Sequence, residues 1–261
     1  MSSRSQTLRH TVSAANFSLG AYSANIHDAF AFTANQAALA GYKAGAIGAS
    51  GERRFMLAEN SVYHLAAALP TKNLGAFGLS VRYAGFSDFN DNEIGFAYAR
   101  SLGKTVSVGV QFNYYGYRVT GYESGSNISF EAGALFRVLP KVSVGLHVYN
   151  PVSVQALKTT DLKLPACYKV GLGYDISKDF LIACELVKEE NAGVNVRAGA
   201  EYHFADKFFA RGGFNSEAGG GYAGAGMAWD RFRISVQSGF HPQLGLSPGI
   251  GFQYHFKKDE K

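Results

Sequence analysis

The segment from Val106 to Val119 constrains the fold most, because apolar residues alternate there with small or polar ones. One face carries Val106, Val108, Val110, Phe112 and Tyr114. The other face carries Ser107, Gly109, Gln111, Asn113 and Tyr115. A period of two residues is that of a β-strand. Similar segments account for nearly all the rest of the chain, which predicts an all-β fold.

The alternation predicts fourteen strands, and the connections between them also alternate in length. The expected strands are 43–50, 58–69, 75–87, 92–102, 105–119, 126–138, 141–149, 165–176, 180–189, 194–204, 208–216, 220–229, 231–240 and 247–256. Tight connections such as 102–104 and 139–141 are interleaved with longer or more variable ones such as 51–57 and 150–164. Short turns at one end and longer loops at the other are typical of outer-membrane barrels. We therefore predict a transmembrane, antiparallel, up-and-down β-barrel located in the outer membrane, with lipid as a partner.

The composition agrees with this fold class. The chain has 31 Gly, 20 Phe and 15 Tyr in 261 residues, and only 17% of its residues are charged, which argues against a helix-rich soluble protein. A closed sheet leaves no unpaired edge and satisfies every backbone amide in lipid. The net charge of +5 is scattered along the sequence, so no nucleic-acid partner is expected.

The chain divides into an N-terminal segment (1–42), a barrel (43–256) and a charged tail (257–261). The first segment is rich in alanine, lacks alternation and predicts one or two short helical turns starting near Asp28. Its first ten residues have no apolar core, so we expect that an export signal has already been removed. Cys167 and Cys184 fall about five residues out of register in a hairpin, which predicts two free thiols.

Charged residues of both signs occur on the face opposite the apolar stripes, where they would line the lumen. They are Arg82, Glu93, Glu131, Arg137, Lys169, Glu185, Arg197, Glu201 and Arg233. Charges inside a spanning element pair with one another or face water. The set predicts a self-satisfied network or, alternatively, a polar conduit. Many inward positions are glycine, which indicates curvature or the close approach of other atoms.

No catalytic motif, phosphate-binding loop or CxxC pair occurs in the sequence. The nearest catalytic arrangement is His147 with Ser143 or Asn150, and a spectator histidine explains it better. A loop with Asp88, Asn90, Asp91 and Glu93 is a weak candidate for calcium. We expect no enzyme activity, no cofactor and no metal.

The last predicted strand resembles the terminal strand by which outer-membrane barrels are recognised for assembly. It alternates and places Phe252, Tyr254 and Phe256 on one face. Five charged residues, 257–261, follow the final aromatic residue, whereas most such barrels end at it.

The segment Ala34-Asn35-Gln36-Ala37-Ala38-Leu39-Ala40 resembles the Asn-Pro-Ala-Gly/Ala-Leu-Ala segment of the fourteen-stranded FadL-like barrels. That family includes the PorV-like proteins of type IX secretion and gliding, and the stretches 51–55 and 98–104 look similar to those relatives. The resemblance implies that residues 1–42 plug the lumen, with the motif at Asn35, Gln36, Ala37, Ala38 and Leu39. Gln36 replaces the proline of the family and the outer loops are short, so no fatty-acid site carries over.

These observations lead to one main functional hypothesis and one alternative. The main hypothesis is a non-enzymatic accessory subunit, PorV-like, that docks with other outer-membrane proteins in a secretion or assembly complex. The alternative is a FadL-like channel for a hydrophobic or small molecule, opened by movement of residues 26–42. A filled lumen and co-purifying proteins would favour the subunit, and a continuous pocket or a gap in the wall would favour the channel.

Overall fold

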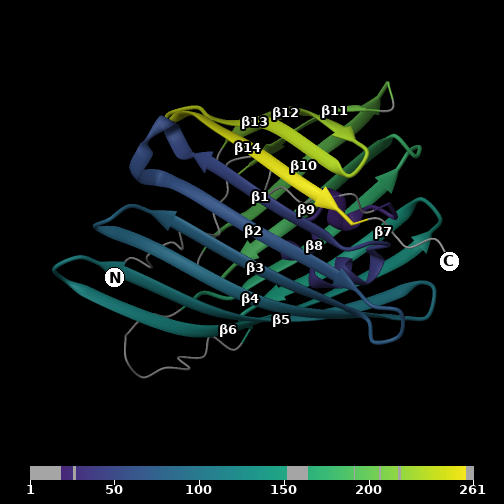
Figure 1. The fold of residues 1–261 in the computed structure, drawn as a ribbon, viewed down its shortest axis with the longest axis horizontal. Helices are drawn as coiled ribbons and strands as arrows, with labels where there is room; N and C mark the ends of the chain where they lie inside the picture. The colour runs from purple at the N-terminus through teal and green to yellow at the C-terminus, as the bar shows by residue number, and fades with distance from the viewer. Residues whose placement is uncertain are drawn as a thin grey trace.

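Fourteen antiparallel strands close into a single barrel in the computed structural model, which describes residues 19–25, 28–151, 164–190, 192–205, 207–216 and 219–256 (Figure 1). The strands are β1 (Ala46–Arg53), β2 (Ser61–Pro70), β3 (Ala76–Gly85), β4 (Phe89–Leu102), β5 (Val106–Val119), β6 (Glu123–Leu139), β7 (Val142–Tyr149), β8 (Cys167–Asp175), β9 (Phe180–Glu189), β10 (Val194–Phe204), β11 (Phe208–Asn215), β12 (Gly220–Trp229), β13 (Phe232–His241) and β14 (Gly245–His255). Each strand pairs with the next, and β14 closes the ring on β1. The predicted fold class is confirmed.

Some strand boundaries differ from the prediction. β1 begins at Ala46 rather than at 43, and β4 and β6 begin earlier than expected, at Phe89 and Glu123. The β4–β5 and β5–β6 ladders continue to the pairs Phe89–Val119 and Val119–Glu123. Backbone pairing therefore extends through polar sequence that carries no apolar alternation. Two further short helices, η5 (Arg54–Met56) and η6 (Ala58–Asn60), fill the β1–β2 connection.

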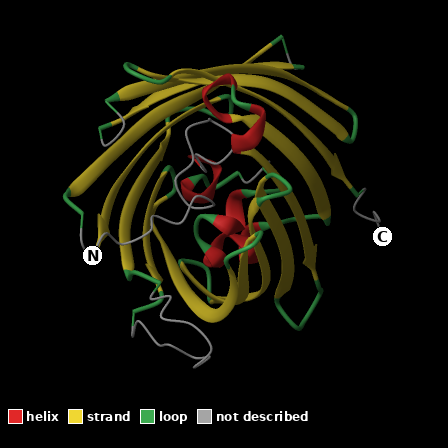
Figure 2. Cartoon of the chain, turned by 90° about the vertical axis from the view of Figure 1, so that its left-hand side faces the viewer, coloured by secondary structure: helices red, strands yellow, loops and turns green. Residues whose placement is uncertain are grey.

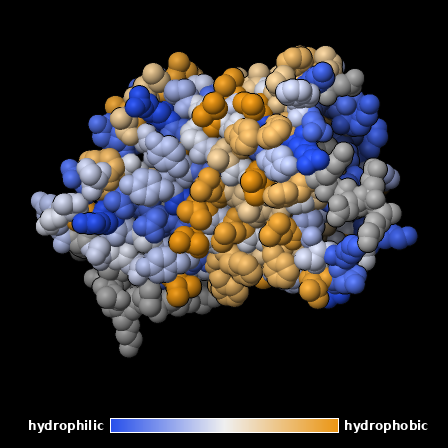
Figure 3. Space-filling view, in the orientation of Figure 1, coloured by the Kyte–Doolittle hydropathy of each residue, from blue (hydrophilic) through white to orange (hydrophobic). Residues whose placement is uncertain are grey.

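The outer surface carries the apolar stripes. On β5 the outward side chains Val110, Phe112 and Tyr114 are exposed, and Phe112 reaches 62%. Figure 3 shows hydrophobic residues gathered across the middle of one face, with hydrophilic ones toward its two ends. Aromatic side chains pack in rows near the tight turns, including Tyr202 with Phe204 and Phe232 with Tyr254. An apolar belt flanked by aromatic side chains is typical of outer-membrane barrels. The predicted location in the outer membrane is confirmed.

Three short helices lie inside the ring of strands (Figure 2). They are η2 (Leu19–Tyr22), η3 (Ala31–Thr33) and η4 (Gln36–Gly41). Residues 19–25 and 28–42 are called the plug below. A barrel of eight strands is filled by its own side chains, whereas sixteen strands leave an aqueous channel. A ring of fourteen strands is therefore wide enough to need additional chain at its centre.

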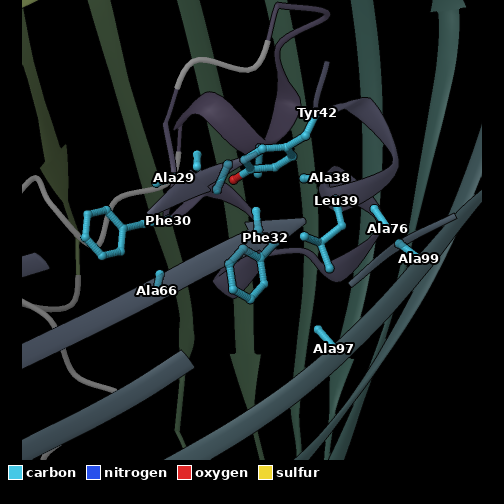
Figure 4. Close-up of a cluster of buried hydrophobic side chains, with 14 of the residues drawn as sticks. Ala29, Phe30, Phe32, Ala38, Leu39, Tyr42, Ala66, Ala76, Ala97 and Ala99 are labelled. Atoms are coloured by element: carbon cyan, nitrogen blue, oxygen red, sulfur yellow. The ribbon is translucent and has the colours of Figure 1, made fainter. Parts of the chain in front are cut away.

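Hydrophobic contacts hold the plug against strands β1 to β4. Phe30 and Phe32 extend from the plug toward the wall that carries Ala66 and Ala97 (Figure 4). Phe32 and Leu39 are completely buried. Burial of each such side chain contributes about 1.5–3 kcal/mol.

Inward glycines provide the space that the plug occupies. Gly109 and Gly133 are partners in the β5–β6 ladder. A Cβ atom at Gly109 would lie 2.6 Å from the Gln36 carbonyl carbon, and one at Gly133 would lie 2.2 Å from Asn35 Oδ1. The inward glycines were predicted to allow the close approach of other atoms, and at Gly109 and Gly133 these atoms belong to the plug.

Several predictions concern segments that lie partly or wholly outside the described residues. The segments are residues 1–18 and 26–27 of the N-terminal segment, most of the 150–164 connection and the tail 257–261. Cys167 and Cys184 are free, as predicted. No helix within the described ranges is long and apolar enough to cross a membrane.

Candidate functional site in the plugged lumen

The candidate functional site is the contact between the plug and the inner wall, and Asn35 lies at its centre. Asn35 has extended backbone angles and caps η4, because its side-chain oxygen accepts a hydrogen bond from the Ala37 amide at 3.1 Å. Its Nδ2 donates to the carbonyl oxygens of Leu146 at 3.0 Å and Ala134 at 3.3 Å. One side chain therefore both starts the helix and attaches it to β6 and β7.

Glu131 collects three polar contacts in the middle of the lumen. Gln36 Nε2 donates to it at 2.8 Å, and Asn113 Nδ2 donates at 2.7 Å. His147 Nε2 lies 2.8 Å from Glu131 Oε2, and both side chains are almost fully buried. Hydrogen bonds to a charged group in a low-dielectric interior are stronger than neutral ones. A proline at position 36, as in the segment that this motif resembles, could not make the contact that Gln36 makes with Glu131.

Tyr22 attaches the start of the plug to strands β7 to β9. Its ring packs against Gly145 and Gly171, its backbone lies against Gly173, and its hydroxyl donates to Glu185 Oε1 at 2.5 Å. Burial, and secondarily the neighbouring Glu185 carboxylate, raise the pKa of the Tyr22 phenol well above its usual value. The phenol therefore stays protonated and remains a donor at all ordinary pH values.

Asp28 and Ser23 complete the attachment. Asp28 Oδ1 accepts hydrogen bonds from the Phe30 amide and from Gln253 Nε2, and its Oδ2 lies 3.8 Å from Arg211 Nη1. Ser23 Oγ donates to Asp175 Oδ1 at 2.7 Å. The plug is therefore bound to strands on both sides of the barrel rather than to one hairpin.

The nine charged residues predicted for the lumen do not form one connected network. Three ion pairs join six of them: Arg82 with Glu93 at 3.1 Å, Arg197 with Glu185 at 3.6 Å, and Arg233 with Glu201 at 2.7 Å. Glu131 instead contacts His147 and accepts a hydrogen bond from Gln36 of the plug. Lys169 faces the lumen beside His147 in the ladder and belongs to none of these three pairs. Arg137 is exposed at the end of β6.

Sequence reasoning missed several contributors. Arg211 was not singled out, Asp28 was named only as a helix start and Asn113 only as an inward residue, although each makes a buried polar contact between strands or with the plug. The predicted residues Arg82 and Glu93 are direct partners in the β3–β4 hairpin, so their pairing follows from local register. Asp28 and Arg211 are distant in sequence, and no local pattern joins them.

The weak catalytic and metal candidates are engaged in other contacts. His147 lies against Glu131, whereas Asn150 donates to the Leu164 carbonyl at 2.6 Å. Ser143 is four residues from His147 along one strand, or roughly 13 Å. Asp91 accepts a hydrogen bond from the Tyr115 hydroxyl and Glu93 pairs with Arg82. Among the described residues, no group of three or more acidic, histidine or cysteine side chains is arranged to hold a metal ion.

The terminal-strand residues lie on the barrel exterior. Phe252 and Phe256 are exposed, and the Tyr254 ring packs against Phe232 and Phe256. Their strand, β14, pairs with β1 at the closure of the barrel. Their role as an assembly signal stays a prediction.

No family model and no curated protein matches the sequence. Solved structures do match. The monoaromatic hydrocarbon channel CymD has a TM-score of 0.66 at 13% identity, over 89% of this chain and 94% of that one. The toluene transporter TbuX of Ralstonia pickettii gives 0.64 at 11%, over 88% and 94%. A FadL homologue of Pseudomonas aeruginosa gives 0.60 at 10%, over 88% and 94%. At these identities the similarity shows the fold, which is that of the FadL-type barrels. The relation to PorV-like proteins stays a prediction.

Proposed function

We propose that this protein is a gated outer-membrane channel for a small polar solute, and that the plug is its gate. The observation that carries the proposal is that barrel closure and plug docking are separate. All fourteen strand pairings form a ring without the plug, and the plug adds side-chain contacts to it. Removal of the plug would leave a ring wide enough for water.

The fold shared with hydrocarbon channels supports transport, but their cargo does not carry over to this chain. The inner wall here carries buried ion pairs such as Arg82 with Glu93 and Arg233 with Glu201. Such a lining favours hydrated solutes, because an apolar molecule gains nothing from contact with charged groups.

Liposome swelling with L-arabinose tests this function. The wild-type barrel should admit the sugar slowly. A double variant, Asn35→Ala with Gln36→Ala, should admit it several-fold faster because the plug loses its contacts to Glu131, Ala134 and Leu146. Leu79→Ala, a change on the lipid face, is the matched control and should behave as wild type. Equal, background-level swelling for all three folded proteins would contradict the proposal.

A second candidate, the PorV-like accessory subunit, is favoured by one observation: the described plug fills the middle of the lumen with buried apolar and polar groups. Mild-detergent purification from outer membranes separates the two candidates. A stoichiometric second membrane protein, with no solute passage, would support the subunit. A monodisperse single chain that passes solute would support the channel.

A further inference from the structure

A cavity of about 420 Å³ lies between the plug and the wall at the end of the barrel that carries the tight turns. The plug contributes Ser23, Asn25, Ala37, Ala40 and Gly41, Lys43 follows the plug, and the wall contributes residues of β4 to β7 and their turns. The volume lies within the range of small-molecule sites, which is about 300–1,000 Å³. The cavity is therefore large enough for a small organic molecule.

The charged residues described around this cavity are all positive. Lys43, Lys104 and Arg137 line it, and no aspartate or glutamate is among its described lining residues. Elsewhere in the lumen arginines face carboxylates, as Arg82 faces Glu93 and Arg197 faces Glu185. Arg137, a member of the predicted charge network, takes part in none of the ion pairs described above. Lys43, Lys104 and Arg137 are exposed, so their charges are accessible to an anionic ligand.

The neutral lining residues are suited to the same ligand. Hydroxyl or amide groups line the cavity at Asn25, Ser101, Thr105, Ser107 and Ser143, whereas the hydroxyl of Ser23 already donates to Asp175. Hydroxyls and amides donate hydrogen bonds to carboxylate and phosphate oxygens, and a guanidinium binds them in a bidentate manner. The cavity thus combines three cations with several neutral donors.

A neighbouring cavity of about 410 Å³ provides a contrast on the same rim. It holds Lys178, Arg231, Arg233 and the shared Lys43, but Asp179 and Asp230 also line it. Lys178 Nζ lies 4.0 Å from Asp179 Oδ2, and Arg231 Nε lies 3.8 Å from Asp230 Oδ2. The neighbouring cavity therefore has a smaller excess of positive charge, because two of its cations lie beside aspartates.

We propose that the cavity between the plug and β4–β7 binds a small anion that bears carboxylate or phosphate groups. The site is independent of the proposed channel activity, since it requires only the folded barrel and plug. Because plug residues form one wall, the bound anion contacts the plug directly.

Isothermal titration of the purified barrel in a neutral detergent, with citrate and inorganic phosphate as probes, tests the site. We expect saturable binding that weakens with ionic strength, because the contacts are ionic. The double variant Lys104→Gln with Arg137→Gln should bind at least about tenfold more weakly, since each lost charged contact costs about one order of magnitude or more. Lys178→Gln, on the same rim but in the neighbouring cavity, is the control and should bind like wild type.

A lipid headgroup carries the same phosphate chemistry, and a second arm distinguishes the two sources. Barrels in nanodiscs of phosphatidylcholine alone, or with phosphatidylglycerol, are titrated with citrate. Competition by phosphatidylglycerol that disappears in the double variant identifies the ligand as a headgroup and supports the site. Equal citrate affinity in both nanodiscs supports a free anion. Absence of saturable binding, or equal affinity of wild type and the double variant, overturns the proposal.

Discussion

Replacement of Gly133 by alanine should loosen the plug while leaving the barrel intact. The new Cβ atom would lie 2.2 Å from Asn35 Oδ1 and 3.1 Å from the Gln36 amide nitrogen, so both groups must shift. Asn35 then loses its cap on Ala37 and its two bonds to the wall, and Gln36 loses Glu131. A helix cap contributes about 1 kcal/mol, a neutral hydrogen bond about 1 kcal/mol and one to a charged group about 1.5–3 kcal/mol, so docking weakens by about 5 kcal/mol.

The same substitution should slightly stabilise the barrel itself. Alanine loses less conformational freedom on folding than glycine in a strand, which favours the barrel by about 0.5–1 kcal/mol. A weakening of 5 kcal/mol raises the undocked fraction of the plug by about three and a half orders of magnitude. Phe32 and Leu39 remain as apolar anchors, so the plug still docks most of the time.

Hydrogen exchange at the Ala37 and Ala38 amides measures this effect, because both amides donate to Asn35 in the docked plug. Their protection should fall about four-thousandfold in Gly133→Ala, while the strand amides stay protected. Gly51→Ala is the control, because the nearest atom to its Cβ is a Tyr63 ring carbon at an ordinary 3.4 Å. Unchanged protection at Ala37 and Ala38, or an equal loss throughout the strands, would refute the reasoning.

Three further predictions concern the lipid face, the plug and the thiols. Phe112→Arg should destabilise the barrel in bilayers by about 2–4 kcal/mol, whereas Tyr122→Arg, in a loop at 90% exposure, should have no effect on urea unfolding. The folded-state pKa of Tyr22 lies above its unfolded value of 10.0, so its contribution to plug docking is complete below pH 10 and is lost as the pH rises further. Alkaline titration of the folded protein at 295 nm should show the same number of phenols ionising around pH 10 in wild type and in Tyr22→Phe, and the loss of one ionising phenol in the variant would contradict the raised pKa. Cys184 is exposed on the lipid side and Cys167 is buried, so an apolar maleimide in liposomes should modify Cys184 alone, and modification of Cys167 at the same rate would argue against the assigned faces.

The strands and their faces were predictable because both follow from a local period of two. The β5 alternation places Gln111 and Asn113 inward and Phe112 outward, as the structure has them. The hairpin register likewise brings Leu172 opposite Cys184, which rules out a disulfide as reasoned from the sequence. Where strands extend beyond the membrane, as at the start of β4 and β6, the apolar alternation ends and the boundaries were wrong.

The contacts of the plug were not predictable, because they join residues distant in sequence. Tyr22 and Glu185 are separated by 163 positions, and Asn35 and Leu146 by 111. The one available signal was the set of inward glycines, which indicated close approach without naming the partner. Hairpin register makes Arg82 and Glu93 direct neighbours, and they form an ion pair, whereas no local pattern indicated that Glu131 binds the plug.

A nitroxide scan along β5 from 108 to 115, in liposomes, tests the central claim that lipid surrounds the apolar face and the plugged polar face is enclosed. Collision with oxygen, which concentrates in lipid, should be high at Val108, Val110, Phe112 and Tyr114 and low at the residues between them. A uniform profile, or low oxygen access at Phe112 and Tyr114 together with a folded protein, would place those side chains in a dry interior and contradict the barrel described above.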